Sequence, residues 1–128
     1  MSTPHVLVAD DDPLLQAILQ HKLVQAGYRV SLVDNGRDAL DVAEREQPSL
    51  VVLDGMMPIL DGFETLRRLK ADPALAAIPV VMLTALKREE DIVSALKLGA
   101  ADYLPKPFNP DELIARLARL TPVRDSAA

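Results

Sequence analysis

Short apolar runs alternate with longer amphipathic segments along this chain of 128 residues. Three of the runs are continuous and four residues long, at positions 6–9, 50–53 and 80–83. Continuous apolar runs of this length are typical of parallel strands that are covered on both faces. Residues 28–33 alternate less strictly and predict a strand nearer an edge of the sheet, and residues 103–104 are a short fifth candidate.

Between these runs, apolar residues recur at the three- and four-residue spacing of an amphipathic helix. The predicted helical stripes are Leu14, Leu15, Ile18, Leu19 and Leu23; Ala39, Leu40, Val42 and Ala43; Phe63, Leu66 and Leu69; Ile92, Val93, Ala95 and Leu96; and Leu113, Ile114, Leu117 and Leu120. Asp12–Pro13 and Asn109–Pro110 each predict a helix start, because a polar N-cap followed by proline suits the first helical turn.

The five strand–helix repeats predict an α/β domain with a parallel sheet, right-handed crossovers and helices on both faces. The chain has the length of one domain and shows no internal repeat or low-complexity segment. We expect the domain to span residues 1–120, with residues 121–128 as a C-terminal tail or the start of a linker.

Composition removes several function classes. The chain has no cysteine, which excludes a disulfide scaffold, a thiol nucleophile and a cysteine-based zinc site. Its net charge is −5, so we expect no direct binding to nucleic acid, which requires a basic surface. The apolar runs are too short to span a bilayer and residues 1–5 show no signal-peptide pattern, so we expect no membrane association and a cytoplasmic protein.

Polar side chains follow four of the predicted strands. Asp10 and Asp11 follow the first, Asp54 the third, Thr84 the fourth and Lys106 the fifth. In parallel sheets, ligands bind outside the carboxyl ends of the strands, where the strand order reverses. Crowded carboxylates need a cation, and hard oxygen ligands favour Mg²⁺. A lysine beside them suits a phosphate group, so the sequence predicts a metal-assisted phosphate site.

The same residues lie in a set of short motifs that occur in order along nearly the whole chain. The motifs are VADDDP at 8–13, LDGMMP at 53–58, DG at 61–62, LTA at 83–85, GA at 99–100 and KPF at 106–108. Together they resemble the receiver domain of response regulators, the CheY-like family. The resemblance implies a (βα)5 doubly wound, flavodoxin-like fold with a five-stranded parallel sheet in the order 2-1-3-4-5.

The resemblance also implies a role for each acidic position. Asp54 would be the phosphoacceptor. Asp11 would bind Mg²⁺ directly, and Asp10 would complete the acidic pocket through water. Asp54 itself and the backbone carbonyl of Met56 would be the further metal ligands, and Mn²⁺ could substitute for Mg²⁺.

The remaining motif residues would act on the phosphoryl group. Lys106 would pair with the phosphoryl oxygens, and the Thr84 hydroxyl and the Ala85 amide would donate hydrogen bonds to them. Thr84 and Tyr103 would form a switch, in which the tyrosine rotamer follows the threonine. The bond between Lys106 and Pro107 would be cis, which is inexpensive only before proline.

The implied function is that of a signalling switch in a two-component phosphorelay, and not that of an enzyme. The phosphoryl donor would be a sensor histidine kinase or a histidine phosphotransfer protein. The changed surface would comprise the fourth helix, the fifth strand and the fifth helix, from about residue 89 to residue 120. Its partner would be a downstream protein target or a fused output domain.

Two positions give an expectation about the lifetime of the phosphoryl group. In this family, the residues two positions after the phosphoacceptor and after the switch threonine flank the path of the hydrolytic water. Here they are Met56 and Leu86, and neither side chain can orient water. We therefore expect a comparatively long-lived aspartyl phosphate.

Three other functions fit the sequence less well. A haloacid-dehalogenase-type phosphatase requires a second carboxylate two residues after its aspartate, where this chain has Met56. A flavodoxin-like electron carrier requires a Ser/Thr-rich phosphate loop where this chain has three aspartates, at positions 10–12. A receiver fold that is never phosphorylated typically lacks the acid pair, the acceptor or the lysine, and this chain keeps all of them.

Overall fold

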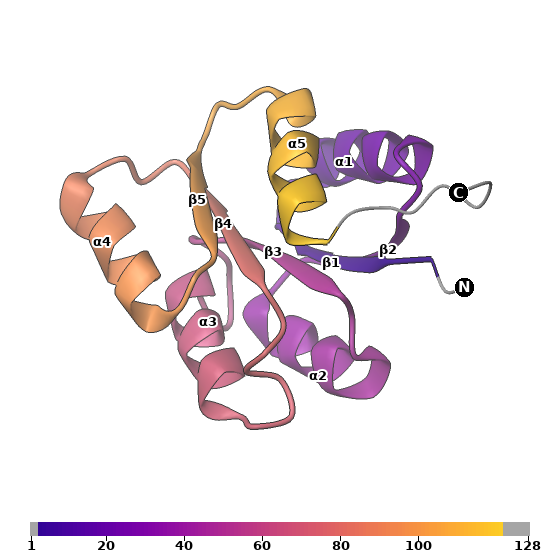
Figure 1. Cartoon of the computed structure of the whole chain (residues 1–128). Coiled ribbons are helices and arrows are strands. Elements are labelled where there is room, and N and C mark those ends of the chain that lie inside the picture. The colour runs from indigo at the N-terminus through magenta and orange to yellow at the C-terminus, as the bar shows by residue number, and fades with distance from the viewer. Residues whose placement is uncertain (1–2, 122–128) are drawn as a thin grey trace.

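The computed structural model describes residues 3–121, in which five strands alternate with five helices (Figure 1). The strands are β1 (His5–Ala9), β2 (Arg29–Val33), β3 (Leu50–Asp54), β4 (Val80–Thr84) and β5 (Asp102–Pro105). The helices are α1 (Pro13–Gln25), α2 (Gly36–Glu46), α3 (Gly62–Ala71), α4 (Glu89–Leu98) and α5 (Pro110–Leu120). The predicted alternation is confirmed. Apart from Thr121, the predicted tail lies outside the described residues.

The five strands form one parallel sheet in the order β2-β1-β3-β4-β5, so the expected order 2-1-3-4-5 is confirmed. Every residue of β1, β3 and β4 is buried, whereas β2 lies at an edge and is partly exposed. These burial patterns explain why three strands are continuous apolar runs and the edge strand is not. The direction in which strands are added reverses beside β1, which makes the carboxyl ends of β1 and β3 the expected ligand site.

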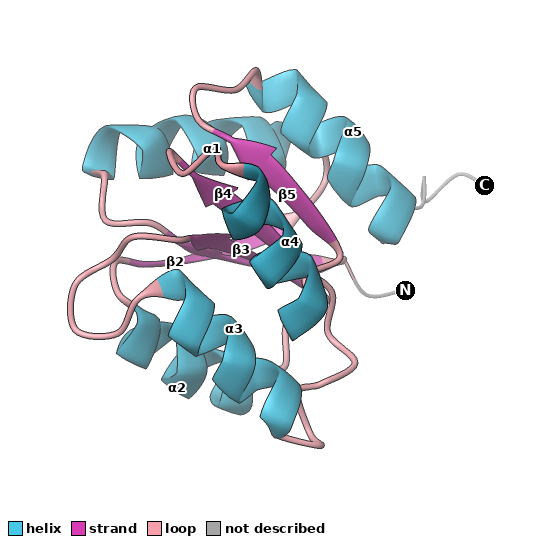
Figure 2. Cartoon of the chain, turned by 90° about the vertical axis from the view of Figure 1, so that its left-hand side faces the viewer, coloured by secondary structure: helices cyan, strands magenta, loops and turns pink. Residues whose placement is uncertain are grey.

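Helices cover both faces of this sheet (Figures 1 and 2). α1 and α5 pack on one face through buried leucines such as Leu19 and Leu113. α2, α3 and α4 pack on the other face, where Val42, Leu66 and Ala95 are buried. Among residues 3–121, no helix has both the length and the apolar character needed to cross a membrane.

The helix starts predicted from capping residues are confirmed. The carboxylate of Asp12 accepts hydrogen bonds from the amides of Leu14 and Leu15, and Pro13 occupies the first position of α1. Asn109 caps α5 in the same way. Such caps satisfy amide groups that have no partner within the helix, and each stabilises the helix by about 0.5–2 kcal/mol.

Only some residues of the apolar stripe of α1 belong to the core. Leu19 and Leu23 are buried, as the helical spacing predicts. Leu14 is 70% exposed and Ile18 is 40% exposed, so only part of the predicted apolar stripe is buried. Leu14, Leu15 and Ile18 line a cleft beside the candidate site instead.

Candidate functional site

The carboxyl ends of four strands bring the predicted site residues to one edge of the sheet. Asp10 directly follows β1, Asp54 and Thr84 are the last residues of β3 and β4, and Lys106 follows β5. The parallel register places Asp54 opposite Leu83, one residue before Thr84. Because neighbouring parallel strands end at the same level, these side chains share one pocket.

Three carboxylates meet in this pocket. One carboxylate oxygen each from Asp10, Asp11 and Asp54 lies within 4.8 Å of the others. Asp10 and Asp54 are buried and Asp11 is exposed, so the cluster has one open side. Like charges this close repel one another, and a divalent cation with a preference for oxygen relieves the repulsion. The donor set therefore fits Mg²⁺ or Mn²⁺.

The ammonium group of Lys106 lies between two of these carboxylates. Its Nζ atom is 2.8 Å from Oδ2 of Asp10 and 3.4 Å from Oδ2 of Asp54. Burial alone would lower the pKa of Lys106, but the hydrogen bond that its ammonium group donates to Asp10 and the charges of Asp54 and Asp10 raise it. The peptide bond between Lys106 and Pro107 is cis, as the resemblance implies.

The pKa of Asp54 is raised above its usual value. The main cause is burial of the side chain, and the negative charge of Asp10 adds to it. The amide of Met56 donates a hydrogen bond of 3.2 Å to Oδ1 of Asp54, and this bond and Lys106 offset the rise only in part. The Met56 amide and Lys106 therefore compensate only part of the cost of holding a negative charge on Asp54 in this pocket.

Thr84 and Tyr103 are joined through the backbone of one residue. The amide of Leu86 donates to Oγ1 of Thr84 at 3.2 Å, and the hydroxyl of Tyr103 donates to the carbonyl of Leu86 at 2.6 Å. Thr84 is fully buried, and its hydroxyl lies beside Gly55, where an added Cβ atom would be 2.8 Å away. Thr84 and Tyr103 are thus linked by hydrogen bonds to the two backbone groups of Leu86. Ala85 lies in the same segment and is exposed.

Two residues support the site in ways that the sequence patterns did not predict. Nε2 of Gln16 donates to the carbonyls of Asp10 (2.7 Å) and Val33 (2.8 Å), which fastens α1 to the ends of two strands. Gly62 begins α3 so close to β3 that a Cβ atom would overlap the backbone oxygen of Asp54. The DG motif at 61–62 signals the glycine, whereas no pattern signals Gln16.

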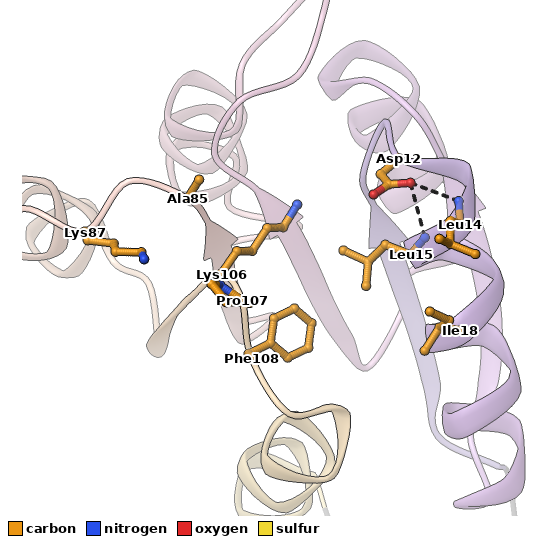
Figure 3. Close-up of a pocket in the computed structure, with 9 residues that line it drawn as sticks. All are labelled: Asp12, Leu14, Leu15, Ile18, Ala85, Lys87, Lys106, Pro107 and Phe108. Carbon is orange, nitrogen blue, oxygen red and sulfur yellow. Dashed lines mark hydrogen bonds between the residues drawn. The ribbon is translucent and has the colours of Figure 1, made fainter.

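A cleft of about 560 Å³ adjoins this site, between the first turns of α1 and the loop after β5 (Figure 3). Its lining residues are Asp12, Leu14, Leu15, Ile18, Ala85, Lys87, Lys106, Pro107 and Phe108. Lys106 and Phe108 stand on one wall, and Leu15 and Ile18 stand on the other (Figure 3). Because Lys106 also contacts Asp54, the cleft opens directly beside the acidic cluster.

Known proteins are similar to this chain in sequence and in fold. A family model for the response regulator receiver domain matches residues 6–118. The alkaline phosphatase synthesis transcriptional regulatory protein PhoP of Bacillus subtilis is 44% identical over 112 residues, which cover 88% of this chain and 45% of PhoP. The chain thus spans about half the length of this curated relative.

Solved structures agree with the sequence matches. The receiver domain of the Francisella response regulator 1452 superimposes with a TM-score of 0.86 at 38% identity, covering 91% of this chain and 95% of that domain. The receiver domain of the sensor histidine kinase PA1611 from Pseudomonas aeruginosa PAO1 superimposes with a TM-score of 0.84 at 34% identity, covering 93% of this chain and 98% of that domain. The latter structure is described with a magnesium ion coordinated in its active site cleft.

Proposed function

The chain belongs to the response regulator receiver domains of two-component systems, and on this premise we propose that Asp54 accepts a phosphoryl group. The observation that carries the proposal is the position of Lys106, within 3.4 Å of Asp54 and beside a cluster of three carboxylates. An ammonium group at this distance suits the oxygens of a phosphoryl group held by Asp54. We assign the domain to residues 1–120.

Asp10, Asp11 and Asp54, together with the backbone carbonyl of Met56, are the proposed ligands of Mg²⁺, for which Mn²⁺ could substitute. When bound, the cation supplies positive charge that offsets the carboxylates and the transferred phosphoryl group. The three converging carboxylates support this assignment, as does the magnesium ion described for the PA1611 receiver domain.

The proposed donor is a phosphohistidine on a sensor histidine kinase or a histidine phosphotransfer protein. An oxygen of Asp54 attacks phosphorus, the phosphorus–nitrogen bond breaks, and its electron pair returns to the imidazole of the donor. Lys106, the Thr84 hydroxyl and the Ala85 amide hold the phosphoryl oxygens as their charge grows. Transfer of this kind depends mostly on positioning and on neutralisation of charge, so the receiver promotes its own phosphorylation while acting as a signalling switch and not as an enzyme.

The cleft beside Lys106 is the proposed contact surface for the donor protein. Leu14 and Ile18 are exposed there, although leucine and isoleucine are usually buried. A donor that presents its phosphohistidine to Asp54 must cover the surface next to Lys106. Its apolar side chains would fill the cleft and remove Leu14 and Ile18 from water.

Phosphorylation is proposed to act on the surface formed by α4, β5 and α5. A phosphoryl group adds about −1.5 to −2 charge at the site. Attraction of the Thr84 hydroxyl to this group would bias the segment around Leu86, which holds Tyr103. This is a shift between two existing arrangements. The partner would be a downstream protein or a fused output domain, since PhoP and other relatives are transcriptional regulators.

The test is to incubate the protein with Mg²⁺ and acetyl phosphate and to weigh the intact chain by mass spectrometry. We expect the wild type to gain the mass of one phosphoryl group and Asp54→Asn to gain none. Omission of Mg²⁺ should prevent the gain. A wild type that gains no mass, even with a histidine kinase as donor, would contradict the proposal.

A further inference from the structure

In the part of the chain that the structure describes, one buried side-chain oxygen has no hydrogen-bond partner: Oδ2 of Asp91. Asp91 lies in the first turn of α4 and is half-buried, whereas Glu89 and Glu90 before it are exposed. Buried polar groups in proteins are almost always paired, and a carboxylate oxygen is among the costliest to leave unpaired. This exception therefore calls for an explanation.

The environment of Asp91 points to Tyr103. The tyrosine is 6% exposed and packs in the same core cluster as Ala95 of α4, with Ile92 of the same helix against that cluster. Asp91 lies one helical turn before Ala95, so it is on the face of α4 that packs towards this cluster. The charge of Asp91 also adds to burial in raising the pKa of the Tyr103 phenol. The tyrosine hydroxyl donates to the carbonyl of Leu86 and not to this carboxylate.

We propose that Asp91 is a positioning residue that opposes the buried arrangement of Tyr103. While the ring is buried, the Asp91 oxygen has neither water nor a donor. An outward turn of the ring would vacate space beside α4, which water could enter to solvate the carboxylate. Asp91 therefore favours the outward ring, whereas the hydrogen bond to Leu86 and the burial of the ring favour the inward one.

Because Asp91 and the burial of the ring act in opposite directions, phosphorylation can shift the equilibrium between the two arrangements of Tyr103. This part of the inference rests on the proposed function of Asp54. Removal of this opposing term would shift the ring further towards the buried arrangement before any signal arrives. A ligand shifts an equilibrium only when both states are populated to a useful extent. Because coupling is reciprocal, removal of the Asp91 charge must also strengthen binding of a phosphoryl group that favours the inward ring.

The sequence offers a direct probe of the ring, because Tyr28 and Tyr103 are the two tyrosines of the chain. Labelled with 3-fluorotyrosine, the protein gives one ¹⁹F resonance from each. Tyr28 is 3% exposed and packs on the opposite face of the sheet, so it is an internal reference. The shift between H₂O and D₂O reports how much water reaches each ring.

The comparison uses Asp91→Asn and the matched variant Glu89→Gln, which removes the same charge from the same helical turn at an exposed position. We expect Asp91→Asn to reduce the isotope shift of Tyr103, and Asp91→Ala, which removes the polar atoms, to do the same. Glu89→Gln should leave the shift as in the wild type. If both Asp91 variants match Glu89→Gln, the inference is wrong.

A second measurement is the affinity for beryllofluoride in the presence of Mg²⁺, as an analogue of the phosphoryl group. We expect Asp91→Asn to bind it about fivefold more tightly, at the low end of typical coupling between sites. In a Tyr103→Ala background, which has no ring, the gain should disappear, and an equal gain there would contradict the inference. A wild type that does not bind beryllofluoride would contradict the proposed function, whereas the ¹⁹F comparison would still decide the role of Asp91.

Discussion

The carboxylate of Asp54 lies 3.4 Å from the ammonium group of Lys106, yet the pKa of Asp54 is raised and not lowered. Lys106 lies closer to Asp10, at 2.8 Å, so one ammonium group is shared between two buried acids. Burial of Asp54 and the charge of Asp10 therefore outweigh the attraction of Lys106. The pocket holds more negative charge than its lysine compensates, and this excess underlies the first two predictions.

The first prediction is that Asp54→Asn stabilises the unphosphorylated protein at pH 7. A raised pKa means that the folded state holds the Asp54 proton more tightly than the unfolded state, so this group destabilises the fold as pH rises through that pKa. We expect the free energy of unfolding at pH 7 to increase, because the substitution removes a negative charge that burial and the charge of Asp10 disfavour. Urea denaturation measures it. The gain should shrink towards acidic pH, and a less stable variant at pH 7 would contradict this interpretation.

The second prediction is that Mg²⁺ stabilises the protein through Asp11. A ligand present at 100 times its dissociation constant raises the free energy of unfolding by about 2.7 kcal/mol, which thermal denaturation detects. Asp11→Asn should remove most of this effect, because Asp11 is the exposed carboxylate of the cluster. Asp41→Asn, at an exposed position of α2, should retain it. Equal stabilisation of both variants would place the cation elsewhere.

These two predictions depend on residues whose proximity in space follows from the sequence pattern. The convergence of Asp10, Asp54, Thr84 and Lys106 follows from two general facts: parallel strands end at a common edge, and each residue comes at the end of an apolar run. Side-chain chemistry then limits what such a group can bind. The exposure of Leu14 could not be predicted in this way, because helical spacing alone does not show which residues of an apolar stripe are covered by other elements.

The third prediction concerns the cleft. Leu14→Ser should slow phosphoryl transfer from a histidine kinase or phosphotransfer protein about tenfold, because tenfold corresponds to 1.4 kcal/mol, a part of the value of one buried leucine. Transfer from acetyl phosphate, which is too small to need the cleft, should be unchanged. Val24→Ser provides the control, since Val24 is an exposed apolar residue in the last turn of the same helix. Equal loss with both donors would show that Leu14 acts on Asp54 and not on docking.

The fourth prediction concerns the lifetime of the aspartyl phosphate. Met56 is 59% exposed beside the site, and its side chain cannot orient a water molecule. Met56→Asn supplies an amide that can, so the phosphoryl group should be lost several times faster than from the wild type. Ile59→Asn places the same amide at another exposed position of the loop and should have little effect. Loss from Met56→Asn that is no faster than from the wild type would refute the expectation of a long lifetime.

The fifth prediction is that the stability of the protein depends on pH through His5, the first residue of β1. His5 is buried, with its Nε2 atom 2.7 Å from Oγ of Ser31 and 3.4 Å from Glu46. Burial, followed by the charge of Arg29, lowers the pKa of His5, and Glu46 offsets this only in part.

Below pH 6.5, His5 is therefore protonated to a greater extent in the unfolded state than in the folded state. The stability contributed by this group is complete above pH 6.5 and is lost as the pH falls towards the lower, folded-state pKa. Urea denaturation at pH 7.5 and about pH 5.5 should show a larger loss for the wild type than for His5→Gln. An equal loss in both proteins would show that other groups carry the dependence.

Features that depend on three-dimensional packing could not be predicted from the sequence. In the sequence, Glu89, Glu90 and Asp91 form an acidic helix start typical of a solvated surface. Only the packing of α4 against β5 shows that Asp91 differs from the two glutamates and has a buried, unpaired oxygen. The link from Thr84 to Tyr103 runs through the backbone of Leu86, which no side-chain pattern records. Gln16 is equally invisible in the sequence, because its partners are backbone carbonyls on two strands.

The measurement that tests the central claim most directly is the location of the phosphoryl group. After treatment with Mg²⁺ and acetyl phosphate, borohydride reduces an aspartyl phosphate to homoserine, which peptide sequencing by mass spectrometry identifies. The account predicts homoserine at position 54, and none there when the phosphodonor is omitted. Homoserine at Asp10 or Asp11 with position 54 unchanged, or its absence from the whole chain, would contradict the assignment of Asp54 as the phosphoacceptor.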